Sequence, residues 1–114
     1  MLIGRVYPKR VGPQTLTTSA VLYFTADKRY FIERFMATNY SANDSSITLY
    51  LVPSGASVAD GYKISGALVV VAHDLTEIPF PVALDVGDKV YALAGDNTAV
   101  NLTFNVNDVE MSVQ

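Results

Sequence analysis

The stretch that decides the fold is TLTTSAVLYFTADKRYFIERFMATN, residues 15–39. Between residues 15 and 24 the side chains alternate, mostly apolar on one face and mostly hydroxyl-bearing on the other. A period of two is typical of a half-buried β-strand. A tight turn at residues 26–28 follows, and residues 29–39 form a second strand. The rest of the chain is expected to build on these two strands.

The second strand has an irregular pattern. Aromatic residues fall on both of its faces, at Tyr30, Phe31 and Phe35. A charged pair, Glu33 and Arg34, interrupts the alternation between them. We therefore expect either a β-bulge near Glu33 or a face shared between the core and an interface.

Further strands follow the same alternation at roughly regular spacing. They occupy residues 47–51, 62–72, 89–94 and 100–106, and the last pattern continues in residues 109–113. The run ALVVVA, residues 67–72, is apolar at every position, so it is expected to be buried on both faces or to lie against a partner. Pro79 and Pro81 lack the N–H group that a central strand needs, so any strand there is expected to lie at a sheet edge or to be very short.

The fold class follows from the number and spacing of these strands. Seven or eight short strands separated by turn residues, without an amphipathic helix, predict a single antiparallel β-sandwich of jelly-roll or related Greek-key type. The alternation alone leaves the strand connectivity open.

The chain divides into an arm and a domain. Residues 1–14 hold Pro8, Gly12 and Pro13, which break regular elements, so we expect an extended N-terminal arm. The sandwich domain is expected over residues 15–114. The arm's apolar residues can still form a short strand or a docking peptide; they are Leu2, Ile3, Val6 and Tyr7.

The charge is unevenly placed along the chain. Residues 1–39 carry six basic and two acidic residues (+4), and residues 40–114 carry two basic and nine acidic residues (−7), for a net charge of −3. A basic leading segment on an acidic body predicts that the arm binds a negative surface on a neighbouring copy or a partner. The alternative is that it folds back on its own body.

The composition favours association with other protein. Half of the residues are apolar, yet the longest apolar run, residues 67–72, is far shorter than the ~20 residues that cross a bilayer. No membrane role is expected, and the apolar excess favours a homo-oligomer or a docked subunit. The first residues lack a secretory signal pattern, so synthesis in a cytoplasm is expected.

Catalytic and metal-binding signals are weak. His73, beside Asp74, is the single histidine, and no activating motif accompanies it, so an ordinary polar contact is the expected role. The chain has no cysteine, which leaves zinc without its usual ligands. We expect no catalytic residue, metal or cofactor.

The turns and the aromatic residues leave two other binding functions open. Calcium remains an alternative for the acidic turns, in which oxygen ligands could converge from Asp85, Asp88, Asp96 and Asn97. A sugar-stacking platform is an alternative for the aromatic set Tyr23, Phe24, Tyr30, Phe31, Phe35 and Tyr40. Direct nucleic-acid binding is not expected, since the body is acidic and the basic arm is short.

The order of segments resembles a recurrent small β-sandwich of tailed-bacteriophage virion proteins. The resemblance covers about four-fifths of the chain. Its segments are YFTADKR (23–29), the Thr-Asn pair at 38–39, ITLYLVPSG (47–55) and LDVGDKVYALAGDNTAVNLTF (84–104). It departs from the family pattern at residues 25–27, where Thr-Ala-Asp stands in place of a Val-Pro-Ala-Gly-like turn.

The resemblance implies a non-enzymatic virion structural protein made in the host cytoplasm. A capsid decoration or cement protein is the first expectation, with the major capsid protein or other virion proteins as partners. The alternatives are a tail, collar or baseplate accessory subunit and a carbohydrate-binding module. The residues expected to contact a partner are Arg5, Tyr7, Lys9, Arg10, Tyr30, Phe35 and Tyr40.

Overall fold

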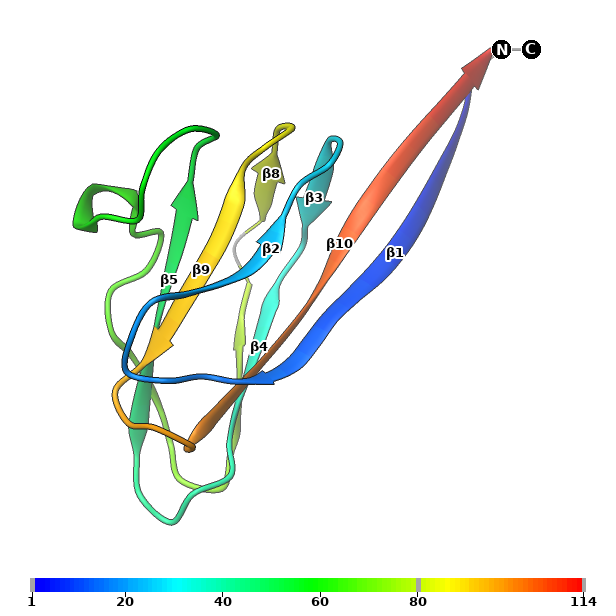
Figure 1. Cartoon of the computed structure of the whole chain (residues 1–114). Coiled ribbons are helices and arrows are strands. Elements are labelled where there is room, and N and C mark those ends of the chain that lie inside the picture. Colours follow the sequence, from blue (N-terminus) through cyan, green and yellow to red (C-terminus); the bar gives the residue numbers. More distant parts are fainter. Residues whose placement is uncertain (1, 80, 114) are drawn as a thin grey trace.

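The computed structural model describes the backbone of residues 2–79 and 81–113 and the side chains of residues 8–79 and 81–108. Two antiparallel sheets pack together (Figure 1). Their strands are β1 (Leu2–Thr15), β2 (Val21–Thr25), β3 (Tyr30–Ile32), β4 (Phe35–Asn39), β5 (Ser45–Val52), β6 (Leu68–Val70), β7 (Leu75–Ile78), β8 (Val82–Leu84), β9 (Lys89–Ala94) and β10 (Val100–Val113). One short 3-10 helix, η1, spans Asp60–Tyr62. No helix in the described part is long and apolar enough to cross a membrane.

Two strands of the larger sheet are interrupted. β4 pairs with residues 100–104 of β10 and β3 pairs with Asn107, so β3 and β4 are two halves of one strand. β7 pairs with β4 and β8 pairs with β3, so these two are halves of the next strand. The break between β3 and β4 falls at Glu33 and Arg34, where the sequence predicts an irregularity.

The strands pair in a nested order. With the halves joined, the described residues form eight strands: β1 pairs with β10, β2 with β9, β3/β4 with β7/β8, and β5 with β6. One long hairpin folded over on itself in this way is a jelly roll, an architecture of two sheets and eight strands. The predicted antiparallel β-sandwich of jelly-roll type is therefore confirmed.

The stretch of residues 15–39 links the two sheets. β2 pairs with β9 in the smaller sheet, whereas β3 and β4 belong to the larger one. The turn between them is held by Ala26, whose N–H donates to the Asp88 carbonyl (2.9 Å) and whose carbonyl accepts from Gly87 N–H (2.7 Å). The predicted first strand is shorter than expected. The chain crosses to the smaller sheet after Leu16, which is buried, and the strand β2 begins only at Val21.

The core lies between the sheets and uses the alternation that the sequence shows. The inward side chains are almost completely buried; they include Phe35 and Ala37 of β4, Ile47 and Leu49 of β5, Val90, Ala92 and Ala94 of β9, and Val100, Leu102, Phe104 and Val106 of β10. Tyr50 faces the other way but is also buried, because Lys63 pairs with it and places its Nζ 6.0 Å from the ring centroid.

The sheet edges explain one confirmed prediction and decide against one of the two alternatives predicted for residues 67–72; that the run lies against a partner stays a prediction. β7 and β8 form an edge of the larger sheet, on either side of the Pro79–Pro81 segment, as the prolines predict. The ALVVVA run is not buried on both faces: Val70 is buried, but Val69 is 63% and Val71 is 51% exposed. β6 is the edge strand of the smaller sheet, so only its inner face meets the core.

The predicted N-terminal arm is extended over its described part but is not free. β1 pairs with β10 along its length, and only its later part, which pairs with residues 101–107, lies on the body as the second alternative expects. Pro8 does not end the strand, since β1 lies at a sheet edge where a missing N–H is tolerated. The register shifts between Val11 and Gln14, and Gly12 there has a φ of +92°.

Candidate functional site

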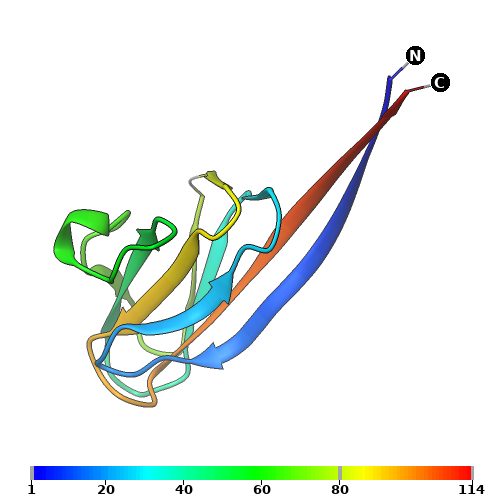
Figure 2. The same cartoon turned by 45° about the horizontal axis from the view of Figure 1, so that its top comes forward.

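β1 and β10 continue beyond the sandwich as a two-stranded ribbon (Figures 1 and 2). Asn107 is the last described residue of β10 that pairs with a strand other than β1. Residues 2–7 and 108–113, six register pairs, form what we call the projecting ribbon. The molecule measures 54 × 29 × 18 Å. Its radius of gyration of 15.1 Å exceeds the ~13 Å expected for a compact domain of this length.

Alternate register pairs of the projecting ribbon differ in chemistry. The pairs Leu2–Val113, Gly4–Met111 and Val6–Val109 join apolar residues, whereas the pairs between them are Ile3–Ser112, Arg5–Glu110 and Tyr7–Asp108. Successive positions of a strand belong to opposite faces. One face of the ribbon is thus composed of apolar residue types alone. A two-stranded ribbon is marginally stable by itself, so such a face favours a further partner.

A cluster of charged and aromatic side chains holds the ribbon where it leaves the sandwich. We call it the ribbon base: Lys9, Asp27, Lys28, Tyr30 and Asp108. Lys28 Nζ lies 2.5 Å from Asp108 Oδ2. The Tyr30 hydroxyl donates to Asp27 Oδ1 at 2.6 Å. Lys9 Nζ lies 6.0 Å from the centroid of the Phe24 ring. Together with Pro8, the ribbon base lines a hollow of about 320 Å³.

The contacts of the ribbon base shift the pKa values of three of its groups. The hydrogen bond from Tyr30 lowers the pKa of Asp27. The same bond raises the pKa of Tyr30, because the carboxylate favours the protonated phenol. The hydrogen bond and charge of Asp108 raise the pKa of Lys28. Each shift favours the form that makes the observed contact.

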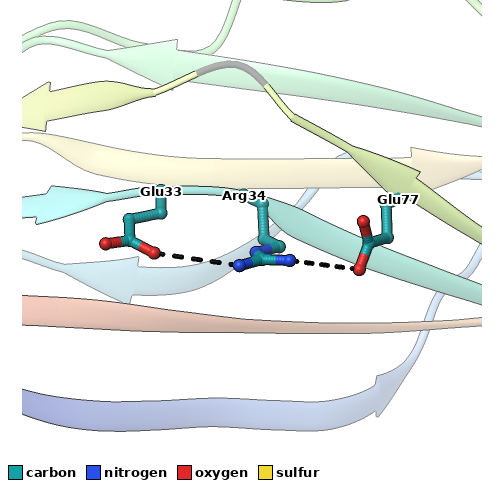
Figure 3. Close-up of polar contacts among 3 residues, drawn as sticks. All are labelled: Glu33, Arg34 and Glu77. Atoms are coloured by element: carbon teal, nitrogen blue, oxygen red, sulfur yellow. Dashed lines mark hydrogen bonds and ion pairs between the residues drawn. The ribbon is translucent and has the colours of Figure 1, made fainter.

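A second hollow lies on the outward face of β4 and β10. It has a volume of about 240 Å³ and is lined by Glu33, Arg34, Met36, Thr103, Phe104, Asn105 and Asn107. Arg34 lies between two carboxylates, with Nη1 3.3 Å from Glu77 Oε1 and Nη2 4.0 Å from Glu33 Oε2 (Figure 3). Arg34 therefore spans the break between β3 and β4 and reaches the edge strand β7.

The basic residues predicted to bind a partner all belong to β1. The side chains of Lys9 and Arg10 are exposed. Arg5 and Tyr7 occupy the register positions opposite Glu110 and Asp108. The side chains of Arg5 and Tyr7 lie outside the described residues.

The aromatic residues predicted to bind a partner are placed differently. Phe35 is fully buried and packs on Phe104 with ring centroids 5.1 Å apart, so it is a core residue and not a surface contact. Tyr30 is 7% exposed and meets Phe24 edge-on at 5.4 Å. These rings fill the sandwich instead of forming the sugar platform that the sequence left open. Tyr40 is 45% exposed and follows β4, at the end of the sandwich opposite the ribbon base.

The candidate metal and catalytic residues are dispersed. Asp88 and Asp96 lie in turns at opposite ends of β9, so the two acidic turns do not converge as a shared calcium site would require. Asp88 Oδ2 accepts from Asp85 N–H and Asp96 Oδ2 accepts from the Ser45 hydroxyl, both at 2.9 Å. Among the described residues no three acidic or histidine side chains gather as a metal site. His73 is exposed in the β6–β7 turn.

Sequence reasoning named Lys9 and Tyr30 of the ribbon base as partner contacts but missed Asp27, Lys28 and Asp108. Lys28 and Asp108 are 80 positions apart, and only the pairing of β10 with its neighbours brings them together. A local signal is present in the sequence: the apolar positions change phase between Val106 and Val109, and this change coincides with the point where β10 leaves β3.

Comparisons with known proteins give a likeness of fold. No family model matches the chain, and no curated protein matches it. A chain of the T13 viral particle of IBDV has a TM-score of 0.55 and 11% identity, over 91% of this chain and 31% of that chain. A chain of infectious bursal disease virus strain Gx has a TM-score of 0.53 and 10% identity, over 91% of this chain and 32% of that chain.

The likeness is thus to one segment of a longer chain. This chain spans about a third of the length of the two virus chains, and 91% of its own residues are included in each superposition. At such low identity the similarity concerns the fold. The protein shares its jelly-roll fold with a segment of the infectious bursal disease virus chains.

Proposed function

We propose that the protein is a non-enzymatic structural component of a virus particle. The observation that carries the proposal is a jelly roll that superposes over 91% of its length on a segment of viral-particle chains. Its first and last strands are paired and projected as one ribbon. Such an element is suited to contact neighbouring subunits while the sandwich supplies a rigid body.

Within that role we propose a capsid decoration or cement protein of a tailed bacteriophage. Support comes from the resemblance of residues 23–29, 47–55 and 84–104 to small phage virion sandwiches. The exposed Lys9 and Arg10 on β1 provide a basic surface for other virion proteins, including the major capsid protein. A protein present in many copies gains avidity from interfaces that are individually weak.

The copy number in purified particles tests this proposal. Quantitative mass spectrometry of intact virions is expected to find the protein in hundreds of copies, as a shell component requires. A small multiple matching the symmetry of a tail, collar or baseplate would favour the accessory-subunit alternative instead. Absence from the particle would contradict both.

The contribution of the basic strand is tested by occupancy. The double variant Lys9→Glu, Arg10→Glu is expected to lower the number of copies per particle at least tenfold. Lys63→Glu, which makes the same type of charge change on a different surface, serves as the control and is expected to keep wild-type occupancy. Equal occupancy of all three proteins would exclude a role for the basic strand in attachment.

A further inference from the structure

β1 is attached to its own molecule by one neighbouring strand and hardly at all by the core. It pairs with β10 and with no other described strand. Its described side chains, residues 8–15, are exposed or half-buried, and none belongs to the buried core. Val11 packs against the core from outside. The sandwich core is therefore formed by the other strands, and β1 is held mainly by its backbone pairing with β10.

The attachment of β1 changes character at residues 12 and 13. These two residues pair with no residue of β10, and Gly12 has a φ of +92°. Just after them the chain is fixed to the body, because the buried Leu16 donates its N–H to the Val100 carbonyl at 2.9 Å. Residues 12 and 13, which we call the pivot, therefore separate residues 2–11 from a part of the chain that stays in place.

The strand that fits the β1 side of β10 is known from the structure itself. Residues 2–11 pair with residues 104–113 in ten consecutive register pairs without a shift. The same ten pairs form when residues 2–11 come from a second copy of the chain. Exchange of an identical element between copies is a low-cost route to a dimer, because the exchanged contact is the one already present in the monomer.

The projecting ribbon gives exchange an energetic advantage. Within one copy the ribbon has two strands, and an isolated pair of strands is marginally stable in water. The pivot bridges three Cα–Cα steps, at most about 11 Å, so copies that exchange β1 hold their ribbons next to each other. Four strands, with an apolar face on each ribbon, meet the condition for stability that two strands do not.

We propose that two copies exchange β1. Residues 2–11 of each copy pair with residues 104–113 of the other, and each sandwich keeps its own chain beyond the pivot. The exchange is reciprocal, so the dimer has two-fold symmetry. The inference goes beyond the proposed function, because it concerns the isolated protein and holds wherever the protein resides.

The monomer and the exchanged dimer compete through concentration. In the monomer the pivot keeps β1 beside its own β10 at an effective concentration on the order of 1 mM. Exchange is therefore expected where copies fold together at comparable concentration or are crowded on a surface. Ten register pairs must open before β1 changes partner, so joint refolding is the direct way to let each strand choose.

Disulfide trapping tests the exchange, since the chain has no cysteine of its own. Arg10 and Asn105 are exposed and lie opposite each other in the register. Opposed Cα atoms of an antiparallel pair lie about 4.5–5.5 Å apart, which suits a disulfide. The single variants Arg10→Cys and Asn105→Cys are mixed, unfolded in urea and refolded together in a glutathione redox buffer at ~500 μM, close to the effective concentration of the monomer.

Exchange joins the two single variants as a covalent heterodimer, which mass spectrometry identifies. Val86→Cys takes the place of Asn105→Cys in the control, because Val86 is 62% exposed but lies in the β8–β9 turn. The heterodimer of Arg10→Cys with Asn105→Cys is expected in at least tenfold higher yield than the heterodimer with Val86→Cys. Equal yields would overturn the proposal.

A locked monomer separates exchange from any other association. The double variant Arg10→Cys, Asn105→Cys should close its disulfide within one chain when oxidised at ~1 μM, far below the effective concentration. Formation of that bond verifies the native register. After refolding at ~500 μM, sedimentation velocity should find dimers of wild type and of the reduced double variant but only monomers of the oxidised one. A wild type without dimers, or an oxidised variant that dimerises equally, would overturn the proposal.

Discussion

At the scale of single residues, Asn39 joins three segments of the chain. It ends β4, is 1% exposed, and uses both ends of its amide. Its Nδ2 donates to the carbonyls of Asn43 (2.8 Å) and Val70 (2.9 Å). Its Oδ1 accepts from the N–H (2.9 Å) and the hydroxyl (2.8 Å) of Ser41. One side chain therefore connects β4, the β4–β5 loop and β6.

Replacing Asn39 should lower the free energy of unfolding more than replacing the exposed Asn43. Asn39→Ala leaves buried carbonyl and amide groups without partners, and we expect a loss of about 2–3 kcal/mol in the free energy of unfolding. Asn43→Ala retains the backbone atoms that Asn43 contributes and should change stability by less than about 0.5 kcal/mol. Urea denaturation measures both. Equal losses would show that the amide network contributes nothing specific.

Tyr30 offers a direct test of the ribbon base. The lowered pKa of Asp27 results first from the Tyr30 hydroxyl, so Tyr30→Phe should move the carboxyl titration midpoint back up towards 3.8. Carbon NMR of the Asp27 carboxyl measures this shift. Tyr40→Phe, which also removes one hydroxyl, should leave the midpoint in place. An unchanged midpoint in Tyr30→Phe would mean that the hydrogen bond is absent in solution.

At the scale of elements, the contacts of the ribbon base contribute stability only over a defined range of pH. The lowered pKa of Asp27 adds stability that is present above its ordinary value and is lost as pH falls through the folded value. The raised pKa values of Lys28 and Tyr30 add stability that is present below their ordinary values and is lost as pH rises through the folded ones. The protection factors of ribbon amides near Asp108, which correct for the intrinsic exchange rate at each pH, should therefore be highest between about pH 5 and pH 9.

Hydrogen exchange of Asp108→Asn provides the comparison. This variant loses the charge of the Lys28 ion pair, so the alkaline decrease in protection should become smaller, while the acidic decrease that depends on Asp27 should persist. Amides of β5, in the core, should show neither effect. An identical pH profile in wild type and variant would show that the Lys28–Asp108 ion pair does not stabilise the ribbon.

The register of β1 depends on a glycine. At Gly12 the φ of +92° suits glycine, and a Cβ would overlap the Leu102 carbonyl oxygen. Gly12→Ala should therefore destabilise the protein by about 1–3 kcal/mol. Gly61→Ala is the control, since nothing lies within 4 Å of the Cβ position there. Thermal unfolding compares the two. Equal melting temperatures would show that β1 adapts to the substitution without cost.

At the scale of the whole molecule, some features of the fold can be predicted from the local sequence pattern, and others depend on pairing between distant strands. Alternation located most strands, and the prolines located the β7–β8 edge, because both depend on a residue and its immediate neighbours. The pairing of β1 with β10 depends on residues about a hundred positions apart, and no periodicity specifies it. The burial of Phe35 follows from the pairing of β4 with β10, and the exposure of Val69 follows from the place of β6 at the edge of the smaller sheet; neither pairing can be read from the alternation.

The candidate site was predictable only in part. The basic character of residues 1–14 indicated a binding segment, and Lys9 and Arg10 are exposed there. The sequence did not indicate that this segment is half of a ribbon, nor that Lys28 and Asp108 fix its base. Charge and hydropathy identify which residues can bind, whereas the folded topology decides where they are presented.

The nested strand order also governs how the polypeptide is made. Translation supplies β5 and β6 together, so the innermost hairpin can close first and pairing can spread outward from it. β1 leaves the ribosome before the other strands yet finds its partner last, when the fourteen residues of β10 emerge. A stalled nascent chain that ends before Val100 should leave β1 open to protease, and the jelly roll is complete only once β10 has been synthesised.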